Sequence, residues 1–229
     1  MFTNKKIMKI AGFEKCSFVD YEKHISCVVF TQGCNMNCFY CHNKELIPCH
    51  SDKELIQEKE IFQFLEKRKK YLDAVVISGG EPTMQQGLEE FIKNIKKMGF
   101  KVKLDTNGSN PHIIENLVSK KLVDYVAMDI KAPLIRYKEF CGSENILVES
   151  LKRTIKFLLK NYVGYEFRTT FAPGLKFKDI FDIALSIKGA ELYVIQKCNI
   201  SENYSFMISD EDFRVLNELK LIKKIKKRY

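Results

Sequence analysis

Three cysteines, Cys34, Cys38 and Cys41, follow one another in the spacing C-x3-C-x2-C. Clustered thiolates bind zinc ions or iron–sulfur clusters. A closed zinc site needs four ligands, so His42 or Cys49 would have to be recruited, and His42 directly adjoins Cys41. Three thiolates on a 4Fe–4S cluster would instead leave one iron open to a substrate or cofactor. The spacing therefore favours an open iron–sulfur site over a closed zinc site.

Other segments with polar or glycine-rich chemistry lie at the ends of short apolar stretches that are typical of buried β-strands. The cysteine segment follows the first stretch, and the others are GGEPT at 79–83, DTNGS at 105–109, MDIKAP at 128–133, Arg168, and QKC at 196–198. The carboxyl ends of parallel strands meet at one rim, where function gathers. We therefore expect these segments to form one site at that rim.

The apolar stretches predict six strands separated by helices. The strands are expected at 25–31, 72–78, 100–105, 124–129, 165–170 and 191–196, and the helices at 51–70, 87–99, 111–121, 146–161 and 178–189. Strand–helix alternation gives a parallel sheet with helices outside it. Six units are too few for an eight-stranded barrel. They predict an α/β fold, either a doubly wound open sheet or a partial (β/α)6 TIM-like barrel, with a short β-rich lead-in at 7–21.

The composition suits one globular enzyme-sized domain. The chain has 229 residues, 45% of them hydrophobic, and a net charge of +9. We expect a single domain over 1–229 with its core at about 22–200. The N-terminus lacks an apolar signal segment and no apolar run is long enough to cross a bilayer, so a cytoplasmic location is expected. In a reducing cytosol, clustered cysteines indicate metal binding rather than disulfides.

The last ten residues, KLIKKIKKRY, carry six basic side chains. They predict that 201–229 forms a basic C-terminal helix with a solvated outer face and with Phe213, Leu216, Leu219 and Ile222 on its inner face. A nucleic-acid-binding patch is the alternative, but the sequence shows no interleaved aromatic platform and no nucleic-acid motif. Neither nucleic acid nor a membrane is therefore an expected partner.

An aromatic residue, Tyr40, precedes the last cysteine of the cluster, and this combination resembles the signature of the radical S-adenosylmethionine (SAM) enzymes. The resemblance implies a 4Fe–4S cluster held by Cys34, Cys38 and Cys41, with SAM bound to the open iron. In that superfamily an electron from the cluster cleaves SAM and releases a 5′-deoxyadenosyl radical, while the protein supplies orientation and excludes water. The usual fold is a partial (β/α)6 barrel, which agrees with the six predicted units.

Further motifs narrow the resemblance to the glycyl-radical-enzyme activases. CHN at 41–43, LDTNG at 104–108 and DYVAMDIKA at 124–132 resemble the pyruvate formate-lyase activating enzymes and, more closely, the activating proteins of anaerobic ribonucleoside-triphosphate reductase. The likeness covers most of 12–198. It implies an oxidoreductase that abstracts a hydrogen from a glycine of an anaerobic ribonucleotide reductase, with a reduced flavodoxin or ferredoxin as electron donor. The alternatives are a small-molecule radical SAM enzyme, such as a 7-carboxy-7-deazaguanine synthase, and a non-enzymatic regulatory protein.

The resemblance also assigns residues to the cofactor SAM. Those expected to bind it are Tyr40, His42, Gly79, Gly80, Glu81, Asp105, Thr106, Asn107, Asp129 and Lys131. Tyr40 and His42 would lie by the adenine. The GGE segment would lie by the amino group, because glycines allow close backbone approach and a carboxylate suits an ammonium.

Two acidic and two basic side chains are expected beside the carboxylate of SAM. Asp105, Thr106 and Asp129 resemble the monovalent-cation site of the activases, and Lys131 would lie near the carboxylate itself. A cation at this position offsets the repulsion between a carboxylate cofactor and two Asp side chains. Arg168 would be costly to bury unpaired, so it is expected to face the cofactor or its acidic neighbours. Asp129, Lys131 and Arg168 are the predicted catalytic residues.

One contact of the family is not expected here. The pyruvate formate-lyase activating enzymes contact SAM through a histidine at the end of the sixth strand, where this chain has Gln196, Lys197 and Cys198. The sequence also has no further cysteine pairs, so a second, ferredoxin-like cluster domain is not expected.

Overall fold

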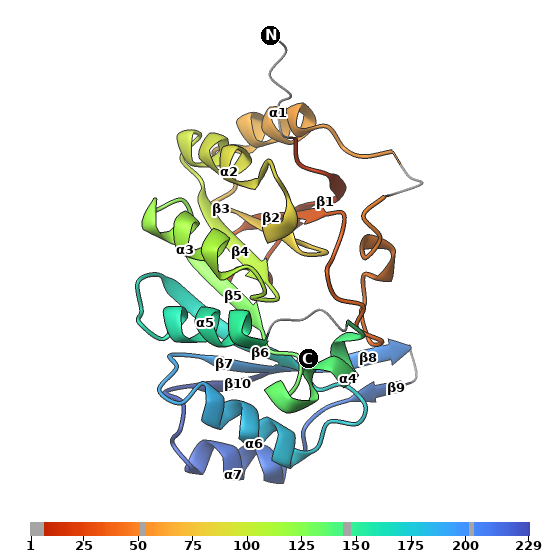
Figure 1. The fold of residues 1–229 in the computed structure, drawn as a ribbon. Coiled ribbons are helices and arrows are strands. Elements are labelled where there is room, and N and C mark those ends of the chain that lie inside the picture. The colour runs from red at the N-terminus through yellow and green to blue at the C-terminus, as the bar shows by residue number, and fades with distance from the viewer. Residues whose placement is uncertain (1–6, 51–53, 144–147, 202–203) are drawn as a thin grey trace. The chain divides into compact units, whose positions relative to one another are not determined.

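The computed structural model describes residues 7–50, 54–143, 148–201 and 204–229. The chain divides into two compact units, each of which combines parallel strands with helices (Figure 1). The first unit comprises Met1–Asn35, Asn43–Thr106 and His112–Val126, and the second comprises Met36–His42, Asn107–Pro111 and Ala127–Tyr229. Within the described ranges, none of the helices has the length and apolar character that crossing a bilayer requires.

The first unit is built on three parallel strands with one antiparallel strand beside them. β2 (Ser26–Thr31), β3 (Ala74–Gly79) and β4 (Lys101–Thr106) run parallel, and β1 (Ile10–Ser17) pairs with β2 in the antiparallel sense. The helices of this unit are α1 (Glu58–Arg68), α2 (Leu88–Lys97) and α3 (Pro111–Ser119), with short 3-10 turns at η1 (Lys44–Leu46) and η2 (Pro82–Met84). Part of the core is a cluster of Tyr21, Val28, Ala74 and Val76.

Local signals explain where these helices begin and end. A capping box between Gln57 and Glu60 starts α1. After α2, Gly99 adopts a φ of +92°, which an L side chain rarely adopts. Pro111 occupies the first position of α3, where its missing N–H leaves no internal hydrogen bond unmade.

The second unit continues from β5 (Tyr125–Asp129), whose last three residues belong to it. β6 (Gly164–Thr170), β7 (Tyr193–Gln196) and β10 (Ile225–Arg228) are parallel neighbours in that order. The helices are α4 (Tyr137–Cys141), α5 (Val148–Leu158), α6 (Phe177–Ser186) and α7 (Asp210–Glu218), and a 3-10 turn, η3 (Leu134–Arg136), precedes α4. β8 (Cys198–Ser201) and β9 (Tyr204–Phe206) form a separate antiparallel pair.

The six predicted strands are confirmed as β2 to β7, with ends that differ by at most two residues, and the β-rich lead-in is confirmed as β1. The five predicted helices are confirmed as α1, α2, α3, α5 and α6. The first helix begins later than predicted, at Glu58, because Ile56 forms an antiparallel β-bridge with Ile10 and Gln57 is the N-cap. The predicted capping residues Ser51 and Asp52 lie outside the described residues, as do residues 146–147 of the predicted helix at 146–161. The single-domain organisation stays a prediction.

The predicted basic helix over 201–229 is wrong. The helix in this region, α7, ends at Glu218, and its first turn is acidic rather than basic. The basic run enters β10, whose Ile225 lies opposite Tyr193 and whose Arg228 lies opposite Gln196. Backbone pairing with the edge of β7 does not require apolar side chains, so a basic segment can form this strand. Leu219, which was expected on the inner face of the helix, is 44% exposed.

Candidate functional site

The cysteine segment belongs to both units. Cys34 lies in the first unit, where its backbone N–H donates to the carbonyl of Ile47 at 3.0 Å. Cys38 and Cys41 lie in the second unit, joined by a turn in which Cys41 N donates to Cys38 O at 3.0 Å. In the described parts of the chain, no three Cys, His, Asp or Glu side chains gather as a group that could hold a metal ion. The three cysteines as one ligand set therefore stay a prediction.

In the second unit, α4 supports the segment that carries Cys38. The N–H of Asn37 donates to the carbonyl of Cys141 at 2.7 Å. Gly142, which ends α4 with a φ of +57°, lies so near that an added Cβ would be 2.4 Å from the Asn37 oxygen. The ring of Phe140 lies 5.8 Å from the ring of Phe39. Backbone, glycine and aromatic contacts thus fix this part of the cysteine segment.

The buried thiol of Cys141 contacts the predicted ligand Cys38. Its hydrogen bond lowers the pKa of Cys38 to about 7, with further help from the charge of Lys131 and against the effect of burial. The thiolate is the form that binds iron, so Cys38 is prepared to act as a ligand near neutral pH. Nothing in the spacing of the cysteines singles out Cys141, which the sequence predicts only as an ordinary buried cysteine.

The two residues predicted to lie by the adenine have different surroundings. Tyr40 is buried, and burial raises its pKa well above the ordinary value. Its hydroxyl donates a long hydrogen bond of 3.5 Å to the carbonyl of Lys131. His42 is exposed. Tyr40 is thus a buried aromatic ring, whereas the side chain of His42 can meet solvent or a ligand.

In the first unit, Gly79 at the end of β3 and Gly80 just after it pack against the chain that precedes Cys34. An added Cβ on Gly79 would lie 2.2 Å from the backbone nitrogen of Thr31, and one on Gly80 would lie 2.2 Å from the carbonyl oxygen of Gly33. Backbone hydrogen bonds join the same segments, including Gly80 N to Thr31 O at 2.9 Å. Glycine is required here because two stretches of backbone touch, which only a residue without a side chain permits.

Glu81 is fully buried and its carboxylate has protein donors. Its Oε1 accepts hydrogen bonds from the backbone N–H of Thr83 at 3.1 Å, the hydroxyl of Thr83 at 2.5 Å and the hydroxyl of Thr106 at 2.7 Å. Glu81 therefore joins the end of β3 to the end of β4. The predicted cofactor residue Asn107 accepts a hydrogen bond on Oδ1 from Ser109 N at 3.0 Å.

Asp105 at the end of β4 has a lysine partner that the sequence reasoning missed. The Nζ of Lys103 lies 3.2 Å from Asp105 Oδ1. On the other side of the carboxylate, the hydroxyl of Ser78 donates to Oδ2 at 3.3 Å. Residues 103 and 105 share one face of the strand because successive side chains alternate. That spacing is the signal that could have found the pair.

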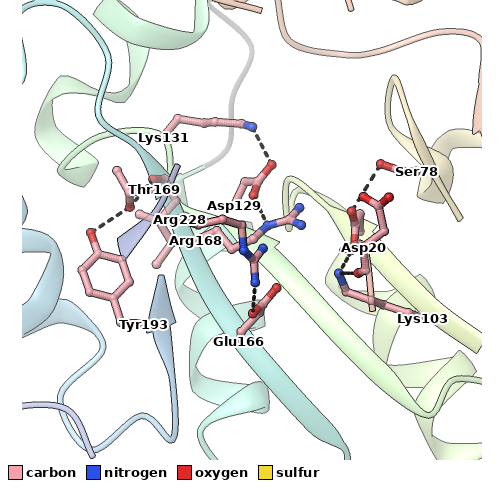
Figure 2. A network of polar contacts seen from close by, with 12 residues as sticks. Asp20, Ser78, Lys103, Asp129, Lys131, Glu166, Arg168, Thr169, Tyr193 and Arg228 are labelled. Atoms are coloured by element: carbon pink, nitrogen blue, oxygen red, sulfur yellow. Dashed lines mark hydrogen bonds and ion pairs between the residues drawn. The ribbon is translucent and has the colours of Figure 1, made fainter. Parts of the chain in front are cut away.

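In the second unit, Asp129, Lys131 and Arg168 come together as one ion network, as Figure 2 shows. Arg168 Nε lies 2.7 Å from Asp129 Oδ1, and Lys131 Nζ lies 2.8 Å from Asp129 Oδ2. Burial would raise the pKa of Asp129, but Arg168 and Lys131 outweigh burial and hold it below its ordinary value. Burial opposes the charge of Lys131, but Asp129 raises the pKa of Lys131 well above its ordinary value. All three predicted catalytic side chains are therefore charged.

A second ion pair lies on β6 and β10. Arg228 Nη2 is 3.2 Å from Glu166 Oε2, and the carboxylate is almost fully buried (Figure 2). Glu166 and Arg168 are two residues apart on β6, so they share the face of the strand that carries the Asp129 network. The opposite face carries Thr169, which accepts a hydrogen bond from Tyr193 OH at 2.9 Å. The sequence reasoning missed Glu166 and Arg228 because it placed the basic tail on a solvated helix.

Comparison with known proteins agrees with this chemistry. The Radical SAM superfamily model matches residues 28–187. A protein of Methanocaldococcus jannaschii, named provisionally as a glycyl-radical enzyme activating enzyme, is 40% identical over 230 residues, which is 96% of this chain and 92% of that protein. The pyruvate formate-lyase 1-activating enzyme of Escherichia coli is 33% identical over 132 residues, covering 55% of this chain and 52% of that enzyme.

Two further matches are more distant. The 7-carboxy-7-deazaguanine synthase of Clostridium acetobutylicum is 30% identical over 130 residues, 56% of this chain and 57% of that enzyme. The crystal structure of Streptococcus suis SuiB bound to its precursor peptide SuiA superposes with a TM-score of 0.66 at 14% identity, over 88% of this chain and 48% of SuiB. The match thus spans about half of SuiB, and it shows the fold alone. Together with the parallel strands, it confirms the predicted fold class.

The chain belongs to the radical SAM superfamily. Within it, the match over nearly the whole chain places the protein among the glycyl-radical enzyme activating enzymes. Membership of the superfamily implies SAM and a 4Fe–4S cluster as cofactors. The residues present suit both groups, because Cys38 ionises near neutral pH and the charged Lys131 suits a carboxylate. The comparisons thus exclude the non-enzymatic alternative.

Proposed function

We propose that this enzyme activates an anaerobic ribonucleoside-triphosphate reductase by abstracting a hydrogen from the Cα of one glycine, which leaves a stored glycyl radical. The observation that carries the proposal is the 40% identity, over 96% of the chain, to a protein named provisionally as a glycyl-radical enzyme activating enzyme. The choice of reductase rests on the motifs CHN, LDTNG and DYVAMDIKA in the sequence. The proposed electron donor is a reduced flavodoxin or ferredoxin. The proposed location of the enzyme is the cytoplasm.

Cys34, Cys38 and Cys41 are the proposed ligands of the 4Fe–4S cluster. When bound, the cluster and SAM together supply the radical that takes the hydrogen atom. The protein's own part is to orient SAM and to keep water from the radical. Tyr40, which is buried, offers the adenine an apolar surface, and Gly79 and Gly80 present backbone to the amino group.

The ion network on β5 and β6 is proposed to hold the carboxylate end of SAM. Lys131 is charged and attracts a carboxylate, while Asp129 fixes the position of the ammonium at 2.8 Å. Arg168 holds the other oxygen of Asp129, so the Asp129 carboxylate cannot rotate without losing a charged hydrogen bond. The network therefore positions Lys131 before the cofactor arrives, which reduces the cost of ordering on binding.

The test is anaerobic reconstitution with iron and sulfide, reduction, and incubation with SAM and the candidate reductase. We expect an electron paramagnetic resonance signal from a glycyl radical, with added hyperfine splitting when the glycine carries ¹³C at Cα. A Cys38→Ser variant should give no signal. The matched control is Cys16→Ser, at an exposed cysteine outside the proposed ligand set, and it should give the wild-type signal. SAM cleavage without any radical on the reductase would contradict the choice of partner.

A small-molecule reaction is the second candidate, favoured by the partial match to 7-carboxy-7-deazaguanine synthase. The two functions differ in what triggers SAM cleavage. An activase forms 5′-deoxyadenosine in proportion to the reductase present, whereas a synthase forms it only with a small pterin substrate. Measuring 5′-deoxyadenosine with each of the two separately decides between them.

A further inference from the structure

Lys103 is a buried charged residue in the middle of β4, only 2% exposed. An isolated ammonium in this position would be very costly, so its partners decide what it does. Its Nζ lies 3.2 Å from Asp105 Oδ1 and also donates to the backbone carbonyl of Asp20, as Figure 2 shows for the two labelled residues Lys103 and Asp20. The ammonium is thus held between a carboxylate and a carbonyl oxygen within the first unit.

The carboxylate of Asp105 is positioned from two sides as a result. Lys103 lies at Oδ1, and the hydroxyl of Ser78 on the neighbouring strand β3 donates to Oδ2 at 3.3 Å. The two contacts come from different strands, the ammonium from β4 and the hydroxyl from β3. Its negative charge is balanced inside the first unit, by a side chain two residues away on the same strand.

The monovalent-cation site that the resemblance implies does not fit this arrangement. Asp105 and Asp129 were the acidic residues expected to hold the ion, and each has a side-chain cation of its own. Asp105 has Lys103 at 3.2 Å. Asp129 has Arg168 at 2.7 Å on one oxygen and Lys131 at 2.8 Å on the other. An alkali ion bound to either carboxylate would have to share it with a positive side chain, which like-charge repulsion disfavours.

We propose that Lys103 is a positioning residue whose ammonium replaces the monovalent cation, so that SAM binding in this enzyme does not depend on an added alkali ion. A lysine ammonium is a compact unit charge, as an alkali ion is. Because the ammonium belongs to a side chain of β4, it is always present and does not have to be bound from solution, as an alkali ion does. The proposal rests on the proposed function only in that the enzyme must bind SAM.

The test measures the affinity of the anaerobically reconstituted enzyme for SAM in two buffers, one with choline as its only added cation and one with potassium. For the wild type we expect the same affinity in both. Lys103→Met should bind SAM about tenfold more weakly in choline, equivalent to about 1.4 kcal/mol, and should recover in potassium because the ion can now enter beside Asp105. Lys101→Met, on the exposed start of the same strand, is the matched control and should behave as wild type in both buffers.

Two results would overturn the proposal: a wild type that loses SAM affinity when potassium is removed, or a Lys103→Met variant that is weak in both buffers. The perturbation of the reduced cluster's electron paramagnetic resonance spectrum on adding SAM gives a second readout that is independent of turnover. If circular dichroism shows that Lys103→Met does not fold, Lys103→Arg keeps the charge and should stay independent of potassium. A wild type that binds SAM in neither buffer would instead reject the proposed function itself.

Discussion

The ion pair between Arg228 and Glu166 offers a sharp test of the role of the C-terminal strand. Glu166 lies on β6 and is only 3% exposed, and its carboxylate oxygen is 3.2 Å from Arg228 Nη2 on β10. Replacing Arg228 by Met keeps most of the length of the side chain and removes only its charge and donors. The buried carboxylate of Glu166 then loses its ion pair with Arg228.

The expected loss follows from the cost of removing one partner of a buried ion pair. Removing one partner of a buried pair costs about 3–5 kcal/mol. The side chain of Arg228 is 32% exposed, so water can reach part of the space it leaves, and we expect the low end, about 3 kcal/mol. For a chain of this size each kcal/mol lowers Tm by about 2–4 °C, so Arg228→Met should lower Tm by about 6–12 °C.

Thermal unfolding followed by circular dichroism at neutral pH measures this shift. The matched control is Lys223→Met, which breaks an exposed ion pair with Glu191 just before the same strand and should leave Tm unchanged within error. Adding Glu166→Gln to Arg228→Met also removes the negative charge of the pair and should recover most of the loss. If Arg228→Met has the same Tm as the Lys223→Met control, the ion pair does not stabilise the fold and the reasoning is refuted.

Three further predictions follow from other contacts. Gly80→Ala should abolish iron incorporation on reconstitution, because the added Cβ would lie 2.2 Å from a backbone oxygen. The measurement is the iron content per protein. Gly12→Ala is the control and should incorporate iron normally, because its added Cβ would have its nearest contact at 3.4 Å. Hydrogen bonds from lysine and asparagine side chains lower the pKa of Glu89 to about 2. The Glu89 carboxylate therefore stabilises the fold fully above pH 4.5, and this stabilisation is lost as the pH falls toward 2. Glu89→Gln should therefore lower Tm at pH 7 and leave it unchanged near pH 2. Cys141→Ala should slow alkylation of Cys38 in cluster-free protein at pH 7, because Cys38 then loses the hydrogen bond that lowers its pKa to about 7; an unchanged rate would contradict that contact.

The strands were predictable because buried parallel strands read as continuous apolar runs bounded by turn residues. VVF in β2 and AVVI in β3 carry this signal with little ambiguity. β10 does not, since only Ile225 in IKKR is buried and three basic residues follow it. Its position depends on hydrogen bonds to the edge of β7, which any sequence without proline can make. A short edge strand of this kind leaves almost no trace in composition, so the basic run was assigned to a helix.

The candidate site was predictable in its residue types but not in its internal partners. The sequence located Glu81 and Thr106 as separate cofactor residues, whereas the structure joins them by a hydrogen bond of 2.7 Å. It read the glycines at 79 and 80 as an approach for a ligand, whereas both also pack against the backbone before Cys34. Such contacts bring together segments far apart in the chain, and a single sequence contains no record of which segments meet.

One rule of strand geometry would nevertheless have recovered the missing charges. Opposite charges stand two residues apart within a strand at Lys103 and Asp105 on β4 and at Glu166 and Arg168 on β6. Side chains two apart in a strand share one face, and the flanking residues of β4 and β6 are buried, so these charges cannot be placed on a solvated surface. Each acid must then be balanced by a nearby base, whether on its own strand or the next. An apolar strand that carries this spacing therefore predicts buried charges that are balanced by nearby counter-charges.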